Sequence, residues 1–350
     1  MASTGANIRD GKFKVVVTDY TFPDFSRYAD ELKQLPVDLI IPADETLEAF
    51  VAEARDADAL IHEHLFLTAA VIDVLERCRI ISHHGKGVDN IAVDRATERG
   101  IIVSNVLDAS VHEVSEHVFA LVLALQRKLH DYDAAVRTGR WHVAVGEPVR
   151  RLHGSTLGLI GFGNLARHVA IKARAFGMNV VAYARYPTDE LVRQYGVKFA
   201  PLADVMSTSD VVSVHLPLTP ETRAIVSRDM LNRMKPHAVL VNISRGGLID
   251  EQALVEALRT GRIAGAGLDV LVDEPAPPEH PILTLPNVLI TPHCAWYSEE
   301  GRDDVERRTA REVARVLAGG RPVSWVNPDA AQAFAARFEP GGHETRSQTV

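Results

Sequence analysis

The stretch 157-LGLIGFGNLARHVA-170 joins an apolar run, a turn with two glycines and a segment of helical periodicity. Gly161 permits a tight turn after a strand, and Gly163 lets another molecule approach the backbone where a Cβ would collide. A helix that opens at Asn164 directs its first backbone N–H groups toward the same point. This strand–turn–helix pattern predicts a site for the pyrophosphate of a dinucleotide, with an ordinary βα turn as the alternative.

The third position of the G-x-G-x-x-G pattern is Ala166 rather than glycine. Helix and strand pack closely at that position, and a methyl group is the smallest side chain after hydrogen. The replacement therefore weakens the pattern only slightly. The residues of this turn that are predicted to contact a dinucleotide are Gly161, Phe162, Gly163, Asn164 and Leu165.

The composition is that of a folded, acidic protein. Of the 350 residues, 46% are hydrophobic and 24% are charged, which argues against disorder. A formal net charge of -8 disfavours binding to nucleic acid or to an anionic membrane surface. The longest apolar helical stretch, residues 118–125, is too short to span a bilayer, and the first residues show no signal-peptide pattern. Together with two widely separated cysteines, these features predict a cytoplasmic protein.

Short apolar runs alternate with amphipathic segments, which predicts βα units around parallel sheets. The predicted strands are 12–20, 37–41, 58–61, the start of 79–90 and 100–106 in a first series, and 156–161, 178–184, 210–216, 237–244, 264–271 and 288–293 in a second. The second series fits a doubly wound sheet. One long helix is predicted at 110–130 with Ser110 as its N-cap, and residues 331–350 are predicted to form a flexible tail.

Several segments of the second half stand in a characteristic order, namely RRLHGSTLGLIGFGNLA, VVSVHLPLTPETR, VNISRGGLIDE, GLDVLVDEP and TPHCAWYSEE, and GKGVDNIAVDRATERGIIVSN precedes them. Together they resemble the D-isomer-specific 2-hydroxyacid dehydrogenase family over about residues 12–326. The resemblance implies an α/β fold of two Rossmann-like parallel-sheet domains, one flavodoxin-like and one doubly wound, with a cleft between them. It implies a discontinuous substrate domain, 1–108 and 296–330, and an NAD(P)-binding domain, 109–295.

The resemblance implies reversible hydride transfer between NAD(P)H and a 2-keto or 2-hydroxy acid of D configuration. Arg245 offers a planar fork that can hold the substrate carboxylate and polarise the adjacent carbonyl. His293 is the natural proton donor and acceptor, because imidazole titrates nearest to neutrality. Glu274 resembles the carboxylate that orients this histidine and favours its charged form. Taken singly, the three residues would be read as a surface ion pair, a buried histidine and a loop carboxylate.

Further positions match the cofactor site of the family. Asp269 resembles the residue that accepts a hydrogen bond from the nicotinamide carboxamide, with a strand-end turn as the alternative. His215, Thr222 and Ile243 match positions near the cofactor, and a helix cap is an equal alternative for Thr222. Arg245 and His293 complete the set of residues that the resemblance places at the cofactor.

The residues after the second strand of the doubly wound sheet bear on the choice of dinucleotide. About twenty residues after Gly161, where NAD-preferring relatives carry an acidic residue, the chain has Ala184 and Arg185. The missing carboxylate removes repulsion of a 2′-phosphate, and the guanidinium of Arg185 can pair with that phosphate. This favours NADP(H), or the use of both dinucleotides. The alternative is that Arg185 only covers the adenine while NAD(H) binds.

At two places the sequence departs from the commonest pattern of the family that it resembles, and both places are predicted to contact the substrate. Lys86 and Gly87, in the loop HHGKGVDN, are predicted to bind substrate, and a lysine at this place resembles phosphite dehydrogenases or suits a larger, more anionic acid. A solvated lysine is the alternative. Trp296, three residues after His293, resembles a subgroup of corepressor-like (C-terminal-binding-protein) and phosphoglycerate-dehydrogenase-like members, where it would line the substrate pocket. Packing at a hinge is the alternative for Trp296.

Two alternatives to a 2-hydroxyacid dehydrogenase remain, namely a dinucleotide-sensing scaffold with little turnover and a phosphite-type dehydrogenase. The complete set of Arg245, Glu274 and His293 favours catalysis. Since relatives pair through the nucleotide domain, a homodimer is predicted, with 139-GRWHVAVGEPVRR-151 at the contact. No metal site is predicted, because no His or Cys residues have zinc-site spacing.

Overall fold

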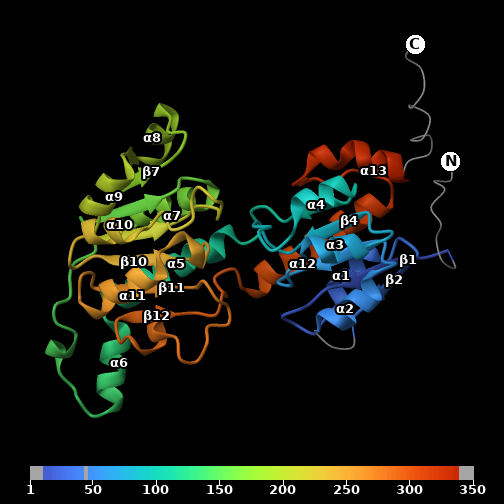
Figure 1. Ribbon diagram of the computed structural model, residues 1–350. Helices are drawn as coiled ribbons and strands as arrows, with labels where there is room; N and C mark the ends of the chain where they lie inside the picture. Colours follow the sequence, from blue (N-terminus) through green and yellow to red (C-terminus); the bar gives the residue numbers. More distant parts are fainter. Residues whose placement is uncertain (1–10, 43–45, 339–350) are drawn as a thin grey trace. The chain divides into compact units, whose positions relative to one another are not determined.

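The computed structural model describes residues 11–42 and 46–338. The chain divides into two compact units, one formed by the residues up to Ala109 and from Glu299 onward, the other by Ser110–Ser298. Each unit holds one parallel sheet flanked by helices (Figure 1). The prediction of two α/β parallel-sheet domains is thereby confirmed. In the described part of the chain, no helix combines the length and the hydrophobicity that crossing a bilayer requires.

The first unit contains a five-stranded sheet in the flavodoxin-like order β2-β1-β3-β4-β5. Its strands are β1 (Phe13–Val17), β2 (Val37–Ile40), β3 (Ala59–His62), β4 (Ile80–His83) and β5 (Ile102–Asn105). Successive side chains of β1 enter different apolar clusters, since Val16 belongs to one cluster and Val15 and Val17 to the other. Burial on both faces explains why these strands are almost continuously apolar in sequence.

Helices from both parts of the chain that form the first unit cover this sheet. They are α1 (Ser26–Leu32), α2 (Leu47–Ala54), α3 (Ala69–Val74), α4 (Val93–Glu98), α12 (Glu299–Leu317), η4 (Pro328–Ala330) and α13 (Ala331–Phe338). The long helix α12 packs against α1, β3 and β4. Val313 and Val316 of α12 are buried in the same cluster as Val15 and Val17, so the chain segment after Ser298 completes the core of the first unit.

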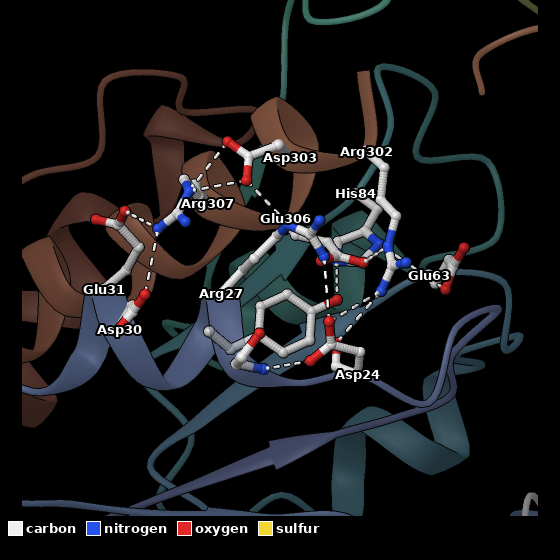
Figure 2. Close-up of polar contacts among 12 residues, drawn as sticks. Asp24, Arg27, Asp30, Glu31, Glu63, His84, Arg302, Asp303, Glu306 and Arg307 are labelled. Carbon is white, nitrogen blue, oxygen red and sulfur yellow. Dashed lines mark hydrogen bonds and ion pairs between the residues drawn. The ribbon is translucent and has the colours of Figure 1, made fainter. Parts of the chain in front are cut away.

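Charged side chains join α12 to α1 (Figure 2). Arg27 pairs with Asp303 at 2.9 Å and with Glu306 at 3.2 Å, and Arg302 pairs with Glu306 at 2.7 Å. Arg302 and Glu306 are buried, and buried charges persist only when they are paired. His84 lies in the same network through a 2.7 Å hydrogen bond with the Tyr28 hydroxyl, so the network holds the end of β4, where the loop with Lys86 begins.

The predicted flexible tail begins too early. Residues 331–338 form α13, and its Arg337 donates hydrogen bonds of 2.6 Å to the carbonyl oxygens of Arg99 and Glu76. Phe334 packs against the apolar cluster of β1 and α12. The prediction was wrong here because the segment AQAFAARF is rich in residues that favour a helix, and these tertiary contacts stabilise a helix that would be too short to persist alone. The remainder of the predicted tail, 339–350, lies outside the described residues.

The second unit contains a seven-stranded parallel sheet in the order β12-β11-β10-β9-β6-β7-β8. Its strands are β6 (Thr156–Ile160), β7 (Asn179–Tyr183), β8 (Lys198–Phe199), β9 (Val211–Val214), β10 (Val239–Asn242), β11 (Gly265–Leu268) and β12 (Val288–Ile290). The short strand β8 has no counterpart among the predicted strands. The strand order reverses between β6 and β9, and doubly wound sheets bind ligands beyond the carboxyl ends of the strands at such a point.

The helices of the second unit are α5 (Val111–Gln126), α6 (Leu129–Arg137), η1 (Val143–Gly146), α7 (Asn164–Ala175), α8 (Asp189–Tyr195), α9 (Leu202–Thr208), α10 (Arg228–Arg233), η2 (Gly246–Leu248), α11 (Glu251–Arg259) and η3 (Pro281–Thr284). The single helix predicted at 110–130 is divided, because Lys128 adopts a left-handed conformation with φ of 53°. Ser110 occupies the N-cap position of α5 as predicted, but its side chain makes no capping hydrogen bond.

Candidate active site

The glycine turn between β6 and α7 has the geometry of a phosphate cradle. Gly161 adopts φ of +100°, and a Cβ there would lie 2.7 Å from the carbonyl oxygen of His215, so both conformation and space require glycine. Gly163 caps α7, and no atom lies within 4 Å of the place where its Cβ would be. The space beside Gly163 and the amino end of α7 therefore fit a phosphate group.

His215 follows β9 on the other side of the strand-order reversal. Both ring nitrogens are buried, and neither has a hydrogen-bond partner among the described residues. Burial lowers the pKa of this imidazole to about 3, so the ring is neutral. Buried polar atoms without a protein partner are uncommon, and a bound ligand beside the glycine turn would supply one. His215 thus fits the dinucleotide site to which the sequence assigned it.

Several predicted cofactor residues have inward-facing side chains. Phe162 and Ile243 are each 7% exposed and belong to the apolar core, and Leu165 packs against the same core. For Phe162 and Ile243, the backbone is the part available to a ligand, whereas the side chain of Leu165 is only partly buried. Ala166 is fully buried, in agreement with close packing of helix and strand at that position. Asn164 is the first residue of α7.

Thr222 holds the loop after β9 rather than capping a helix. Its hydroxyl donates to the carbonyl oxygen of Pro217 at 2.7 Å and accepts from the backbone N–H of Thr219 at 2.8 Å. The following helix, α10, is capped by Ser227, whose hydroxyl accepts from the N–H of Met230. The helix-cap alternative for Thr222 is therefore wrong.

His293 and Glu274 form a direct pair, with 2.7 Å between Nδ1 and Oε2. The backbone N–H of Leu271 donates to the other oxygen of Glu274 at 3.0 Å. His293 has φ of 52°, a left-handed conformation that is uncommon for a residue with a side chain, and its N–H donates to the carbonyl oxygen of Asp269 at 2.9 Å. Backbone strain of this kind persists where surrounding contacts enforce it, often at functional sites.

The electrostatics of this pair favour an ionised Glu274. Partial burial raises the pKa of its carboxyl group, but the hydrogen bond and charge of His293, the Leu271 N–H and the charge of Arg245 together outweigh burial and lower it. The carboxylate thus holds the imidazole through Nδ1, and Nε2 lies on the opposite side of the ring. This is the arrangement in which a histidine exchanges a proton with a substrate.

Arg245 lies between β10 and η2, within the electrostatic reach of Glu274. The side-chain amide of Asn242 donates to its carbonyl oxygen at 2.8 Å. A Cβ on the next residue, Gly246, would lie 2.0 Å from the backbone carbon of Leu271, so only glycine allows the two loops to touch. Arg245, Glu274 and His293 follow β10, β11 and β12, respectively, at the same edge of the sheet. The structure therefore brings the three predicted catalytic residues together.

Asp269 is 2% exposed and is held by neighbours that the sequence did not reveal. Its Oδ1 accepts from the Thr291 hydroxyl at 2.6 Å and from the N–H of Cys294 at 2.9 Å, and its Oδ2 accepts from the N–H of Ala295 at 2.9 Å. The Thr291 hydroxyl lies 2.9 Å from Nε2 of His117 in α5. His117 is distant in sequence, so no local spacing could have assigned it to this site.

The remaining predicted residues lie as follows. Arg185 is exposed just after β7, and its guanidinium lies 5.9 Å from the ring centre of Tyr186. Trp296 contacts Tyr297 edge-on, with ring centres 5.8 Å apart. Lys86 and Gly87 belong to the first unit, where the carbonyl oxygen of Lys86 accepts a 2.6 Å hydrogen bond from Asn105 and its side chain is exposed.

Comparison with known proteins agrees with this geometry. A model of the D-isomer specific 2-hydroxyacid dehydrogenase NAD-binding domain matches residues 119–295. The chain belongs to this family. A glyoxylate reductase of Korarchaeum cryptofilum is 36% identical over 83% of this chain and 89% of its own length. The family resemblance predicted from the sequence is thereby confirmed.

Two further proteins illustrate the range of those to which the chain is similar. D-3-phosphoglycerate dehydrogenase of Methanocaldococcus jannaschii is 37% identical over 93% of this chain, which spans 62% of that relative's length. The crystal structure of an NADPH-dependent glyoxylate/hydroxypyruvate reductase of Sinorhizobium meliloti, in complex with NADP and malonate, superposes with a TM-score of 0.80 at 30% identity. It covers 91% of this chain and 98% of its own.

The His293–Glu274 contact predicts how the pKa of the Glu274 carboxyl group responds to a change at His293. Replacement of His293 by glutamine removes the imidazolium charge and the charge-assisted hydrogen bond, so the pKa of Glu274 should rise. Carbon-13 NMR of labelled glutamate carboxyl groups would follow the titration. The control is His280→Gln, which alters the 3.0 Å pair of His280 with Glu251 and should leave Glu274 unchanged. An unaltered titration of Glu274 in His293→Gln would contradict the assigned pair.

Proposed function

We propose that this protein is an NAD(P)-dependent oxidoreductase that interconverts 2-keto acids and D-2-hydroxy acids. The observation that carries the proposal is the His293–Glu274 pair, with Arg245 after the neighbouring strand, in the unit that also holds the glycine turn. The dinucleotide, when bound, supplies or accepts the hydride. The side chains of this unit bind the acid, orient it and exchange its proton.

Each of the three side chains has a distinct role in the proposed reaction. The guanidinium of Arg245 pairs with the carboxylate of the acid and polarises the neighbouring carbonyl. Nε2 of His293 gives a proton to the carbonyl oxygen during reduction and takes it back during oxidation. Glu274 holds the ring through Nδ1 and stabilises its protonated form in either direction. The proposed reaction includes no covalent intermediate between any of these three side chains and the acid.

The proposed substrates are small anionic 2-keto acids, with glyoxylate as the first to test. Support comes from the name of the Korarchaeum cryptofilum relative, glyoxylate reductase, and from the malonate-bound reductase of Sinorhizobium meliloti. Lys86 is the residue of the first unit that would favour a more anionic acid, such as a phosphorylated one, or phosphite. Absorbance of the reduced dinucleotide with a panel of these compounds would rank them.

Replacement of His293 tests the catalytic proposal. In His293→Gln we expect kcat to fall by about 10²–10⁴-fold, because a positioned acid–base group contributes about that factor. Dinucleotide binding, measured by fluorescence of the reduced nicotinamide, should be retained. His280→Gln, which alters another histidine–carboxylate pair in the same unit, should keep the parental kcat. Parental kcat in His293→Gln would refute the role of His293, whereas tight dinucleotide binding by the parent protein without turnover of any panel compound would favour a sensing scaffold.

We infer a preference for NADP(H) over NAD(H). Arg185 follows β7 in the place of the acidic residue that binds the ribose hydroxyl in NAD-preferring members. Its exposed guanidinium can pair with a 2′-phosphate. The description of the Sinorhizobium meliloti reductase as NADPH-dependent supports NADP(H) as a cofactor that members of this family use.

A charge reversal at Arg185 tests this preference. In Arg185→Asp the ratio of kcat/KM for NADPH to that for NADH should fall by about tenfold or more, since a charge-assisted hydrogen bond is worth about 1.5–3 kcal/mol. Steady-state kinetics with both dinucleotides would measure the ratio. Arg193→Asp, at another exposed arginine in α8, is the matched control and should leave the ratio unchanged. An unchanged ratio in Arg185→Asp would discredit the inference.

We propose further that the protein is a cytoplasmic homodimer paired through α6 and the segment that follows it. Trp141 and Val143 are 86% and 79% exposed, an unusual exposure for such large apolar side chains. Leu129 and Val136 of α6 are also exposed, at 56% and 44%. Cys78 and Cys294 are free thiols, as expected in a reducing compartment.

Light scattering tests the dimer directly. The parent protein should have twice the chain mass, and the double variant Trp141→Glu, Val143→Glu should have the mass of one chain, because two charges would be buried in the contact. Val323→Glu, at a residue 78% exposed in the first unit, is the control and should remain dimeric. A monomeric parent protein would exclude the proposal.

A further inference from the structure

Three side chains far apart in sequence converge beside the proposed active site. His117 comes from α5, Asp269 from the end of β11 and Cys294 from the loop after β12. One ligand atom of each, a ring nitrogen, a carboxylate oxygen and the sulfur, lies within 4.8 Å of the other two. In the described part of the chain, this is the one group of three or more His, Cys, Asp or Glu side chains arranged closely enough to share a metal ion.

The nitrogen and the oxygen of this cluster are spaced as two ligands of a small divalent cation would be. Nε2 of His117 lies 3.8 Å from Oδ1 of Asp269, and the Thr291 hydroxyl lies 2.9 Å from the first atom and 2.6 Å from the second. Ligand bonds of about 2.0–2.3 Å in a tetrahedron place neighbouring ligand atoms roughly 3.3–3.8 Å apart. Small side-chain adjustments would therefore allow one ion to contact the nitrogen, the oxygen and the sulfur.

The surroundings of the cluster orient Asp269. The backbone N–H of Ala295 donates to Oδ2 of Asp269, which turns Oδ1 toward Thr291 and His117. Hydrogen bonds of this kind position the ligands of known metal sites and contribute to their affinity. Asp269 is almost fully buried, so its charge is poorly screened by solvent and attracts a cation more strongly than a surface carboxylate would.

The donor set selects the class of ion. A thiol sulfur with an imidazole and a carboxylate suits Zn²⁺ and similar thiophilic cations, whereas Mg²⁺ and Ca²⁺ prefer oxygen ligands alone. We propose that His117, Asp269 and Cys294 form a binding site for Zn²⁺ or a cation of similar preference, with a water molecule as the fourth ligand. On binding, the S–H bond of Cys294 breaks, its proton passes to solvent, and the sulfur coordinates the ion as a thiolate.

The site would make the protein sensitive to such ions. The consequence rests on the proposed function and on the role that the family resemblance implies for Asp269, which is to accept a hydrogen bond from the nicotinamide carboxamide. A metal ion bound to Asp269 would compete with that hydrogen bond. Because the same ion would also bind Cys294, it would restrict the movement of the neighbouring His293. Binding of the cation should therefore inhibit turnover reversibly.

Cobalt is a spectroscopic probe of the site that requires no activity. Addition of Co²⁺ to the full chain, after treatment with a chelator, should give the visible absorption of a tetrahedral ion and a thiolate-to-cobalt band, both saturating at one ion per chain. Zn²⁺ should abolish both bands. In Cys294→Ser the thiolate band should be lost, and in His117→Gln the affinity should fall at least about tenfold, as loss of one ligand would cause.

The matched control is Cys78→Ser, which replaces the other, fully buried thiol and should keep both bands. Circular dichroism would establish that each variant is folded, and Cys294→Ala provides a second variant without sulfur. Absence of a thiolate band in the parent protein, or its persistence in folded Cys294→Ser and Cys294→Ala, would overturn the proposal. The two proposals fail separately, because cobalt binding without turnover would refute only the enzyme, and turnover without the thiolate band would refute only the metal site.

Discussion

The parallel pairing of β10, β11 and β12 is the constraint on which the candidate site depends. Because parallel strands all end at the same edge of a sheet, residues that follow different strands are brought close together whatever their distance in sequence. Arg245, Glu274 and His293 follow these three strands in turn. Had any neighbouring pair been antiparallel, one of the three groups would have been placed at the opposite edge.

Close backbone contacts convert this common edge into a defined geometry. Gly246 allows the loop of Arg245 to touch Leu271, whose N–H in turn orients Glu274. The hydrogen bond from the N–H of His293 to Asp269 holds the histidine in its left-handed conformation. The three candidate groups are thus positioned largely by main-chain contacts.

The sequence predicts most of the fold because the strands are apolar and the turns carry glycine. It also predicts that Arg245, Glu274 and His293 lie together, since each follows a strand within a family pattern. It does not predict α13, which depends on the contacts of Arg337 and Phe334 with distant residues, nor the break at Lys128, which depends on local backbone conformation. His117 illustrates the general limit, because its contact with Thr291 joins two segments that only the folded chain brings together.

Asp269 connects the chemistry of the site with its proposed sensitivity to metal ions. Its Oδ2 is held by the N–H of Ala295, whereas Oδ1 already accepts from Thr291 and Cys294. The family resemblance implies that this carboxylate accepts a hydrogen bond from the amide of a nicotinamide, whereas in the proposed metal site it coordinates a cation. The two ligands differ in what they require of Cys294, because only the cation needs its sulfur. The thiol of Cys294, next to His293, therefore separates the two roles of Asp269. Binding of a nicotinamide does not need this thiol, whereas binding of a thiophilic ion does.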